Sequence, residues 1–368
     1  MTLQHALNEM VSRKASDLYI TVDSPCLLRI DGNLHPLGET LDLHAVEKMF
    51  TEAMDSDLEA EYRASKEANF ALVRGDLRFR VSAFWQRELP GMVIRRIETD
   101  IPDFFALNLP MDMQKMALAK RGLVLVVGAT GSGKSTSMAA MTGYRNANRS
   151  GHILTVEDPI EFVHKHNKCI VTQREVGLDT ESYEIALKNS LRQAPDMILI
   201  GEIRTPETME YAMNFAETGH LCMATLHANN ANQALERILH LVPKERREQF
   251  LFDLSLNLKC ILAQQLIPDA HGVGRHGAFE LLINTPRVAD LIRRGELHEI
   301  KETMAKSNES GMMTFDQSLY ELYSAGKITE QDALHHADSA NDLRLMIKVG
   351  SKNQLSNNSL SGVTVDMG

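Results

Sequence analysis

The chain has 368 residues, of which 43% are hydrophobic and 24% are charged. This length favours two domains over one, and the composition is that of a globular protein with sizeable cores. The formal net charge of −10 argues against a dedicated nucleic-acid-binding protein. No apolar run approaches the length of about 18 residues that a membrane-spanning helix needs.

The beginning of the chain and its cysteines indicate a cytoplasmic protein. Residues Met1–Met10 lack the basic stretch and the following apolar stretch that mark an export signal. No two cysteines are close enough to form a C-x-x-C pair, so neither a zinc site nor a redox dithiol is expected. We expect each to be a small buried hydrophobic residue in a reducing compartment: Cys26, Cys169, Cys222 and Cys260.

Residues 1–105 are expected to form a separate α+β domain. Apolar residues at helical spacing predict helices over Leu3–Arg13 and Leu43–Ala64. Two strand candidates on either side of the turn Arg74–Asp76 indicate a hairpin. The predicted strands are Asp17–Thr21, Leu27–Ile30, Phe70–Val73, Leu77–Phe84 and Val93–Ile97. This mixture favours an antiparallel sheet with helices on one side.

After a linker at Glu98–Asp103, the pattern over residues 106–350 changes to apolar strands that alternate with helices, which is typical of a parallel α/β sheet. The predicted strands are Leu123–Val127, Ile153–Val156, Met197–Ile200, Leu221–Thr225 and Phe279–Ile283. The predicted helices are Tyr183–Gln193, Pro206–Thr218, Ala231–Leu241 and a long one over Glu245–Gln265. Residues 351–368 are rich in Ser, Asn and Gly, and we predict a disordered tail there.

A glycine-rich stretch carries the clearest chemical signal. It reads Gly128-Ala-Thr-Gly-Ser-Gly-Lys-Ser-Thr136, matches the pattern G-x-x-x-x-G-K-S/T, and lies between a predicted strand and a helix. The alternative is a turn without a ligand. In such loops backbone N–H groups and the helix N-terminus bind phosphates, Lys134 contacts the β- and γ-phosphates, and the Ser135 hydroxyl binds Mg²⁺. The predicted residues for ATP with Mg²⁺ are Gly128, Ala129, Thr130, Gly131, Ser132, Gly133, Lys134, Ser135 and Thr136.

Two further strands are predicted to place carboxylates at the same edge of the sheet. The segment Asp196–Glu202 is an apolar strand followed by an acid, which is typical of a Walker B segment, and Glu202 would hold Mg²⁺. The segment Leu154–Glu161 also ends in acids, and Glu161 is the candidate to activate water. At both places the alternative is an acidic turn exposed to solvent.

Histidines and arginines could supply the remaining groups. His227 follows the strand Leu221–Leu226 and is predicted to sense the γ-phosphate, although a structural histidine is as consistent with the sequence. Arg78, Arg80 and Arg95 lie on predicted strands of the first domain. They could stabilise a phosphate across an interface, or they could form an exposed face with salt bridges.

These motifs occur in an order that resembles the secretion ATPases of type II secretion, type IV secretion and type IV pili. The matching segments are Gly128–Thr136, Ile153–His164, Asp196–Arg204 and Glu217–His227, which resemble the Walker A motif, Asp box, Walker B motif and His box of that family. Residues Ala15–Leu18 and Leu28–Gly32 resemble its N-terminal domain. The resemblance covers approximately residues 1–345.

Within this family the sequence is most similar to the retraction ATPases, the PilT and PilU group. It has neither the four-cysteine zinc motif nor the long N-terminal extension of the extension ATPases. PilT-type members carry a segment close to Ala-Ile-Arg-Asn-Leu-Ile-Arg, whereas the corresponding stretch here is Arg287-Val-Ala-Asp-Leu-Ile-Arg293. This departure makes the PilU type the nearer match.

The resemblance implies a PAS-like N-terminal domain, a RecA-like ATPase core, a hexameric ring and ATP bound between the two domains. It implies Glu161 as catalytic glutamate and Glu202 as Walker B glutamate, and it favours a phosphate-contacting role for Arg78, Arg80 and Arg95. The implied function is ATP-driven retraction of type IV pili in twitching motility, alone or with a PilT-type ATPase. The implied location is the cytoplasmic face of the inner membrane, on a PilC-type platform protein. An alternative is a nucleotide-binding adaptor for PilT whose own hydrolysis is secondary.

Overall fold

The structure, a computed structural model, describes residues 1–30, 32–75, 77–97, 100–272, 274–307 and 311–349. Its contacts divide the chain into two compact units. The first comprises Met1–Asp100 with Ile160–Val163, and the second comprises Ile101–Pro159 and the chain from His164 onward. The predicted tail lies outside the described residues. Among the described residues, no helix combines the length and apolar character needed to cross a bilayer.

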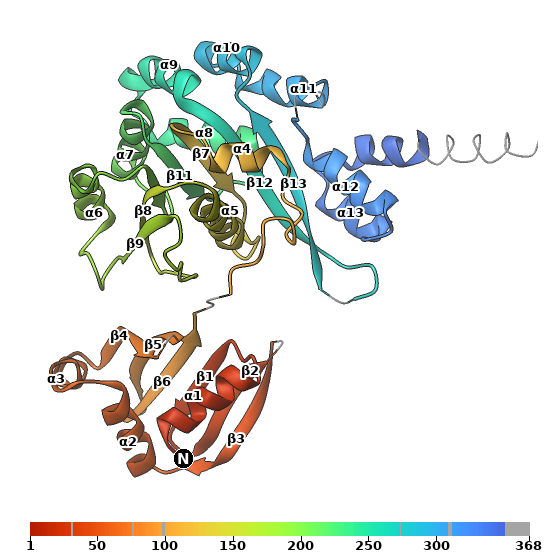
Figure 1. The fold of residues 1–368 in the computed structure, drawn as a ribbon. Helices are drawn as coiled ribbons and strands as arrows, with labels where there is room; N and C mark the ends of the chain where they lie inside the picture. The colour runs from red at the N-terminus through yellow and green to blue at the C-terminus, as the bar shows by residue number, and fades with distance from the viewer. Residues whose placement is uncertain (31, 76, 98–99, 273, 308–310, 350–368) are drawn as a thin grey trace, which may run out of the picture. The chain divides into compact units, whose positions relative to one another are not determined.

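The first unit is built on an antiparallel sheet with the strand order β3-β2-β1-β6-β5-β4 (Figure 1). Its strands are β1 (Asp17–Thr21), β2 (Ser24–Ile30), β3 (Asn33–Leu41), β4 (Glu67–Arg74), β5 (Leu77–Gln86) and β6 (Leu89–Arg96). Its helices are α1 (Leu3–Ser12), α2 (Leu43–Ala53) and α3 (Ser56–Ser65). The apolar faces of α1 and α2 pack against one face of this sheet, to which alternate residues of each strand point, and together they form a single core.

Two predictions for this unit need correction. The helix predicted over Leu43–Ala64 is two helices, because Met54 has an extended backbone and Asp55 caps α3 by accepting a hydrogen bond from the backbone N–H of Leu58. Strand β3 was not predicted, because most of its residues are exposed and its sequence contains Pro36 and Gly38.

The second unit is built on a mainly parallel sheet with the strand order β13-β12-β7-β11-β10-β8-β9. Its strands are β7 (Gly122–Val127), β8 (Gly151–Glu157), β9 (Cys169–Glu175), β10 (Met197–Ile200), β11 (Leu221–Leu226), β12 (Leu258–Pro268) and β13 (Arg275–Ile283). All neighbours are parallel except β12 and β13, which are antiparallel. Together with the antiparallel sheet of the first unit, this confirms the predicted α/β fold class.

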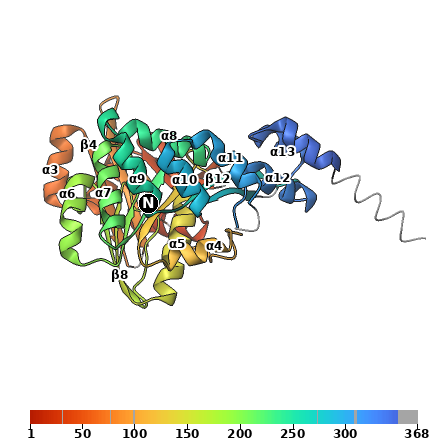
Figure 2. The ribbon, with the colours of Figure 1, turned by 90° about the horizontal axis from the view of Figure 1, so that it is seen from above.

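Helices cover both faces of this sheet. They are α4 (Asp112–Ala117), α5 (Lys134–Asn148), α6 (Tyr183–Ser190), α7 (Pro206–Glu217), α8 (Ala231–Leu241), α9 (Arg247–Asn257), α10 (Pro286–Arg294), α11 (Ile300–Ala305), α12 (Phe315–Ser324) and α13 (Glu330–His336), and residues 340–349 are also helical. Helices α4 and α5 pack on one face and α6, α7 and α8 on the other. Helices α12 and α13 pack at the end formed by β13 and β12 (Figures 1 and 2).

The long helix predicted over Glu245–Gln265 is wrong. The helix α9 ends at Asn257, and β12 begins at the next residue. In β12, Ile261 and Ala263 pack on one face of the sheet while Cys260 and Leu262 pack on the other. A strand that is buried on both faces produces a continuous apolar run, and the period of such a run does not distinguish it from a helix.

Candidate nucleotide-binding and catalytic site

The glycine-rich stretch lies between β7 and α5, as its sequence predicts. Every residue of β7 is buried, and Gly128 follows directly. Gly131 and Gly133 have φ angles of +77° and +88°, in the left-handed region that favours glycine. At Gly128 a Cβ atom would lie 2.6 Å from the carbonyl oxygen of Gln264. The loop can therefore lie this close to β12 only without a side chain at that position.

The loop presents positive charge at the start of α5. No side chain within the described part of the chain caps this helix, so its first N–H groups remain available for an anion. The Lys134 Nζ donates to the carbonyl oxygens of Gly128 and Ala129, at 2.9 Å and 2.8 Å. Burial lowers the pKa of Lys134, and the nearby charge of Glu202 opposes this shift. A bound phosphate would give the ammonium group an anionic partner.

The sequence did not predict Gln264, which holds the loop in place. This residue of β12 is 3% exposed. Its Nε2 donates to the carbonyl oxygen of Ser132, and its Oε1 accepts from the hydroxyl of Ser137, both at 2.7 Å. Gln264 thus joins β12, the loop and the first turn of α5. The available signal was a pair of adjacent amides, Gln264 and Gln265, within a mainly apolar run.

Glu202 and His227 meet at the ends of two adjacent strands, β10 and β11. One carboxylate oxygen of Glu202 lies 3.1 Å from His227 Nε2, and the other accepts a hydrogen bond from Arg204 Nε at 2.8 Å. This hydrogen bond raises the pKa of Arg204. The hydroxyl of Thr225 donates to the carbonyl oxygen of Gly201, which ties the two strand ends together. The structure therefore brings two predicted residues together and adds Arg204.

Ser135 and Glu202 fit the needs of a magnesium ion bound with a nucleotide. Mg²⁺ prefers oxygen ligands and retains several waters, so it needs few protein ligands when phosphates are present. Ser135 is exposed at the start of α5. The charge of Glu202 acts on the pKa of Lys134, the residue that precedes Ser135. Across the described ranges, no cluster of three or more His, Cys, Asp or Glu residues could hold a metal by itself.

The acids of the segment Leu154–Glu161 belong to different units. The Glu157 Oε1 accepts hydrogen bonds from the Thr155 hydroxyl at 2.6 Å and from Gln173 Nε2 at 3.2 Å, so Glu157 helps to join β8 to β9. Glu161 is exposed and belongs to the segment Ile160–Val163, which groups with the first unit. Its position relative to the phosphate-binding loop stays a prediction.

The arginines of the first unit lie on adjacent strands. Arg78 and Arg80 occupy alternate positions of β5, and Arg80 is opposite Arg95 of β6. The Nε of Arg95 donates to the buried carboxylate of Asp17 at 2.8 Å, and this hydrogen bond raises the pKa of Arg95. Arg95 thus forms a salt bridge, as expected if these arginines lie on an exposed, salt-bridged face. A phosphate-binding role for the three arginines stays a prediction.

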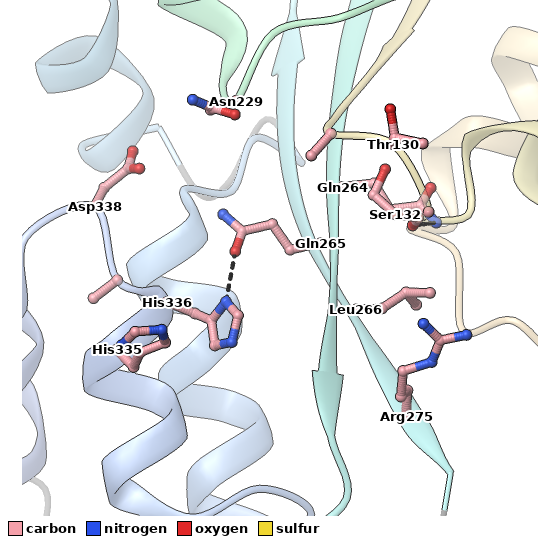
Figure 3. Close-up of a pocket in the computed structure, with 13 residues that line it drawn as sticks. Thr130, Ser132, Asn229, Gln264, Gln265, Leu266, Arg275, His335, His336 and Asp338 are labelled. Carbon is pink, nitrogen blue, oxygen red and sulfur yellow. Dashed lines mark hydrogen bonds between the residues drawn. The ribbon is translucent and has the colours of Figure 1, made fainter. Parts of the chain in front are cut away.

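A cavity of about 470 Å³ opens beside the phosphate-binding loop (Figure 3). The loop forms one wall, the end of β12 forms the floor, and residues of α13 and the chain after it form the opposite wall. The lining residues are Ala129, Thr130, Gly131, Ser132, Asn229, Gln264, Gln265, Leu266, Arg275, His335, His336, Ala337 and Asp338.

The family model described as "Type II/IV secretion system protein" matches residues 1–335. The chain belongs to this family. The type IV pilus ATPase PilU of Pseudomonas aeruginosa is 58% identical over 354 residues, which are 96% of this chain and 93% of that protein. The type IV pilus retraction ATPase PilT of the same organism is 36% identical over 339 residues, with coverage of 92% and 98%. The predicted family is confirmed, as is the greater similarity to PilU than to PilT.

Solved structures agree with this assignment. The crystal structure of the pilus retraction motor PilT with bound ADP matches with a TM-score of 0.88 and 38% identity, covering 94% of this chain and 99% of that one. The Legionella pneumophila ATPase DotB, at 24% identity and a TM-score of 0.75, shows the same fold. The second unit is thus a RecA-like nucleotide-binding core with a phosphate-binding loop.

Proposed function

We propose that this chain is an ATPase that drives or assists the retraction of type IV pili in twitching motility, together with a PilT-type ATPase. The observation that carries the proposal is a phosphate-binding loop accompanied by Glu202 and His227 at adjacent strand ends, in a chain that is 58% identical to PilU over 96% of its length. A phosphate-binding loop alone supports nucleotide binding. The carboxylate of Glu202 and the imidazole of His227 supply the Mg²⁺ ligand and the γ-phosphate contact that ATP hydrolysis also requires.

Each residue has a distinct task in this proposal. Lys134 and the first N–H groups of α5 bind the β- and γ-phosphates of ATP, and Ser135 and Glu202 hold Mg²⁺. The ion supplies positive charge to the transferring phosphoryl group. His227, held by Glu202 at 3.1 Å, senses the γ-phosphate. Glu161 orients and activates the attacking water.

The proposal extends to an assembly. In a hexameric ring at the cytoplasmic face of the inner membrane, docked on a PilC-type platform protein, Arg78, Arg80 and Arg95 neutralise charge on the phosphates. The support for this role of the three arginines is chemical, because a planar guanidinium group can donate to two phosphate oxygens at once. The exposed side chain of Arg95 remains accessible while its Nε is paired with Asp17.

Steady-state ATP hydrolysis of the purified chain tests this proposal. We expect the wild type to hydrolyse ATP and both Lys134→Ala and Glu161→Ala to lose at least about tenfold in rate, with or without purified PilT. Hydrolysis that appears only with PilT, or that does not depend on Glu161, would make the chain an accessory of PilT and would contradict hydrolysis by this chain itself.

The segment Arg287–Arg293 favours one second candidate, an adaptor for PilT. This segment departs from the PilT-type sequence and forms most of α10. Its exposed ends carry ion pairs from Arg287 to Glu299 and from Arg293 to Asp290. Co-purification with PilT that Lys134→Ala leaves unchanged, combined with weak hydrolysis, would support the adaptor over the motor.

A further inference from the structure

A second hollow of the second unit, the α7–α9 groove, lies between helices α7 and α9. Its volume is about 470 Å³, and none of its lining residues belongs to the phosphate-binding loop or to the cavity beside that loop. Its floor includes Met209 and Met213 of α7 and Phe250 of α9. Methionine side chains are flexible and polarisable, so such a floor adapts to apolar side chains of different shapes.

The rim of the α7–α9 groove carries an excess of negative charge. Glu210 Oε1 pairs with Arg246 Nη1 at 3.2 Å. Glu217 and Asp253 also line the groove, and neither forms an ion pair within the described part of the chain. Burial, and then the charge of Asp253, raise the pKa of Glu217, so the two carboxylates lie close enough to repel each other. A cation placed between them would relieve this repulsion.

Exposed apolar side chains continue the groove along α9. Phe252 and Leu256 are 44% and 63% exposed. They follow the groove residue Gln249 by three and seven positions, so they lie on the same side of the helix. Large apolar side chains that are exposed together mark a surface on which another chain packs. The groove and this side of α9 therefore form one apolar surface with an acidic rim.

The helix over residues 340–349 carries the complementary chemistry on its exposed side. Leu345 and Val349 are 62% and 51% exposed, and they form an apolar row. Arg344 and Lys348, each directly before one of them, are exposed as well and form a basic row. Residues four apart lie on the same side of a helix, so the two rows run next to each other. Amphipathic helices with such rows bind in grooves through their apolar side.

The groove and this helix lie on different sides of the second unit. In both views of the ribbon, the blue helix that follows α13 is well separated from α7 and α9 (Figures 1 and 2). One chain therefore does not bring its own two surfaces together. Two identical chains do so when the groove of one copy faces the terminal helix of the next.

We propose that the α7–α9 groove of one copy binds the helix 340–349 of a second copy, with the basic row between Glu217 and Asp253 and the apolar row on the floor. A contact between two different surfaces of identical chains joins them head to tail, as a ring requires. The inference rests on the assembly of the proposed function, which calls for a ring of copies, and it names one contact between them.

Cross-linking of two differently tagged copies of the full chain tests this contact. One copy carries Asn214→Cys at the groove, and the other carries Asn341→Cys on the exposed side of the terminal helix. All four native cysteines are buried, so a short bismaleimide reacts with the introduced thiols. We expect a cross-linked pair that contains both tags. His298→Cys, at another exposed position of the second unit, replaces Asn341→Cys in the matched control and should give no such pair.

A reciprocal reversal of charge separates this contact from unspecific association. Lys348→Glu in the copy that supplies the helix, or Asp253→Lys in the copy that supplies the groove, brings like charges together and should lower the yield of the cross-linked pair about tenfold. Both reversals together should restore most of the yield, because the charges are then opposite again. Glu236→Lys, an exposed position of α8 that does not line the groove, makes the same change of charge as Asp253→Lys and should leave the yield unchanged.

The outcomes separate this inference from the function on which it rests. The inference is wrong if the Asn214→Cys and Asn341→Cys copies give no cross-linked pair, or if the His298→Cys control gives as much. It is also wrong if the single reversals leave the yield unchanged, or if the two reversals together do not restore it. ATP hydrolysis of the wild type is measured in parallel. Hydrolysis without the cross-linked pair overturns the inference alone, whereas a cross-linked pair without hydrolysis overturns the proposed function alone.

Discussion

Single side chains outside the recognised motif hold the phosphate-binding loop in its conformation. Gln264 contributes both ends of its amide, one to the carbonyl oxygen of Ser132 and one to the hydroxyl of Ser137. All three groups are deeply buried, so water cannot replace a lost partner. The amide therefore affects both the stability of the core and the affinity of the loop.

We predict that Gln264→Ala destabilises the chain by about 1–3 kcal/mol, because it leaves a buried hydroxyl and a buried carbonyl unpaired. The same change is expected to weaken ADP binding, since the loop is no longer tied to β12. Denaturant unfolding and ADP titration measure the two effects. Gln249→Ala, at an exposed glutamine, should change neither, and an unaltered loop affinity in Gln264→Ala would refute the positioning role.

The difference between Lys134 and Gln264 shows how far the sequence determines the site. Lys134 was predictable because its role follows from its spacing to the glycines and from the strand and helix on either side. Gln264 lies 130 residues further along the chain, and only the folding of β12 beside β7 brings it to the loop. Residues placed by tertiary contacts have no local pattern, so they become visible only in the structure.

At the scale of elements, the parallel strands β7, β10 and β11 were predictable because each is a short apolar run between turns. The helix α9 and strand β12 were not separable, because their apolar residues continue without a glycine or proline between them. Strand β9 was missed for a different reason. Ile170 is exposed while Cys169 and Val171 are buried, whereas an apolar run suggests that all three residues are buried.

Glu280 of β13 links two helices of the second unit. It is 2% exposed, and it accepts a hydrogen bond from the N–H of Ala231, the first residue of α8, at 2.8 Å. The N–H of Phe315, the first residue of α12, also donates to it. Burial outweighs these hydrogen bonds and raises the pKa of Glu280 to about 7.

This carboxyl group predicts a pH dependence of stability. The folded state retains the proton up to about pH 7, whereas the unfolded chain loses it near the ordinary pKa of 4.5. The folded state binds more protons between these values, so stability from this group falls as the pH rises through this window, by up to about 3 kcal/mol. Glu280→Gln should remove this slope in denaturant unfolding measured across the window. The slope should persist in Glu236→Gln, an exposed position on α8, and its persistence in Glu280→Gln would contradict the assignment.

At the scale of the whole molecule, the two units have separate cores. The core of the first unit consists of residues between Leu3 and Ile94, and the cores on both faces of the second sheet lie beyond Phe104. Separate cores favour independent folding, and the phosphate-binding loop belongs to the second unit alone. The change of sequence pattern after residue 105 predicts a domain boundary there.

We predict that a fragment of residues 1–100 folds by itself and melts cooperatively. In the full chain, ADP at about 100 times its Kd should stabilise the second unit by about 2.7 kcal/mol and leave the melting of the fragment unchanged. Calorimetry of the chain and the fragment measures both. A fragment without a cooperative transition would show that the first unit depends on the rest of the chain.

Twitching motility shows directly whether ATP hydrolysis by this chain drives or assists pilus retraction. A strain without this chain would be complemented with the wild type, Lys134→Ala, Glu202→Ala or His298→Ala, with equal protein levels verified by immunoblot. If ATP hydrolysis at this site drives or assists retraction, the wild type and His298→Ala restore the twitching zone, and Lys134→Ala and Glu202→Ala do not. Normal twitching with Lys134→Ala would contradict the account, because the phosphate-binding loop would then be dispensable for movement.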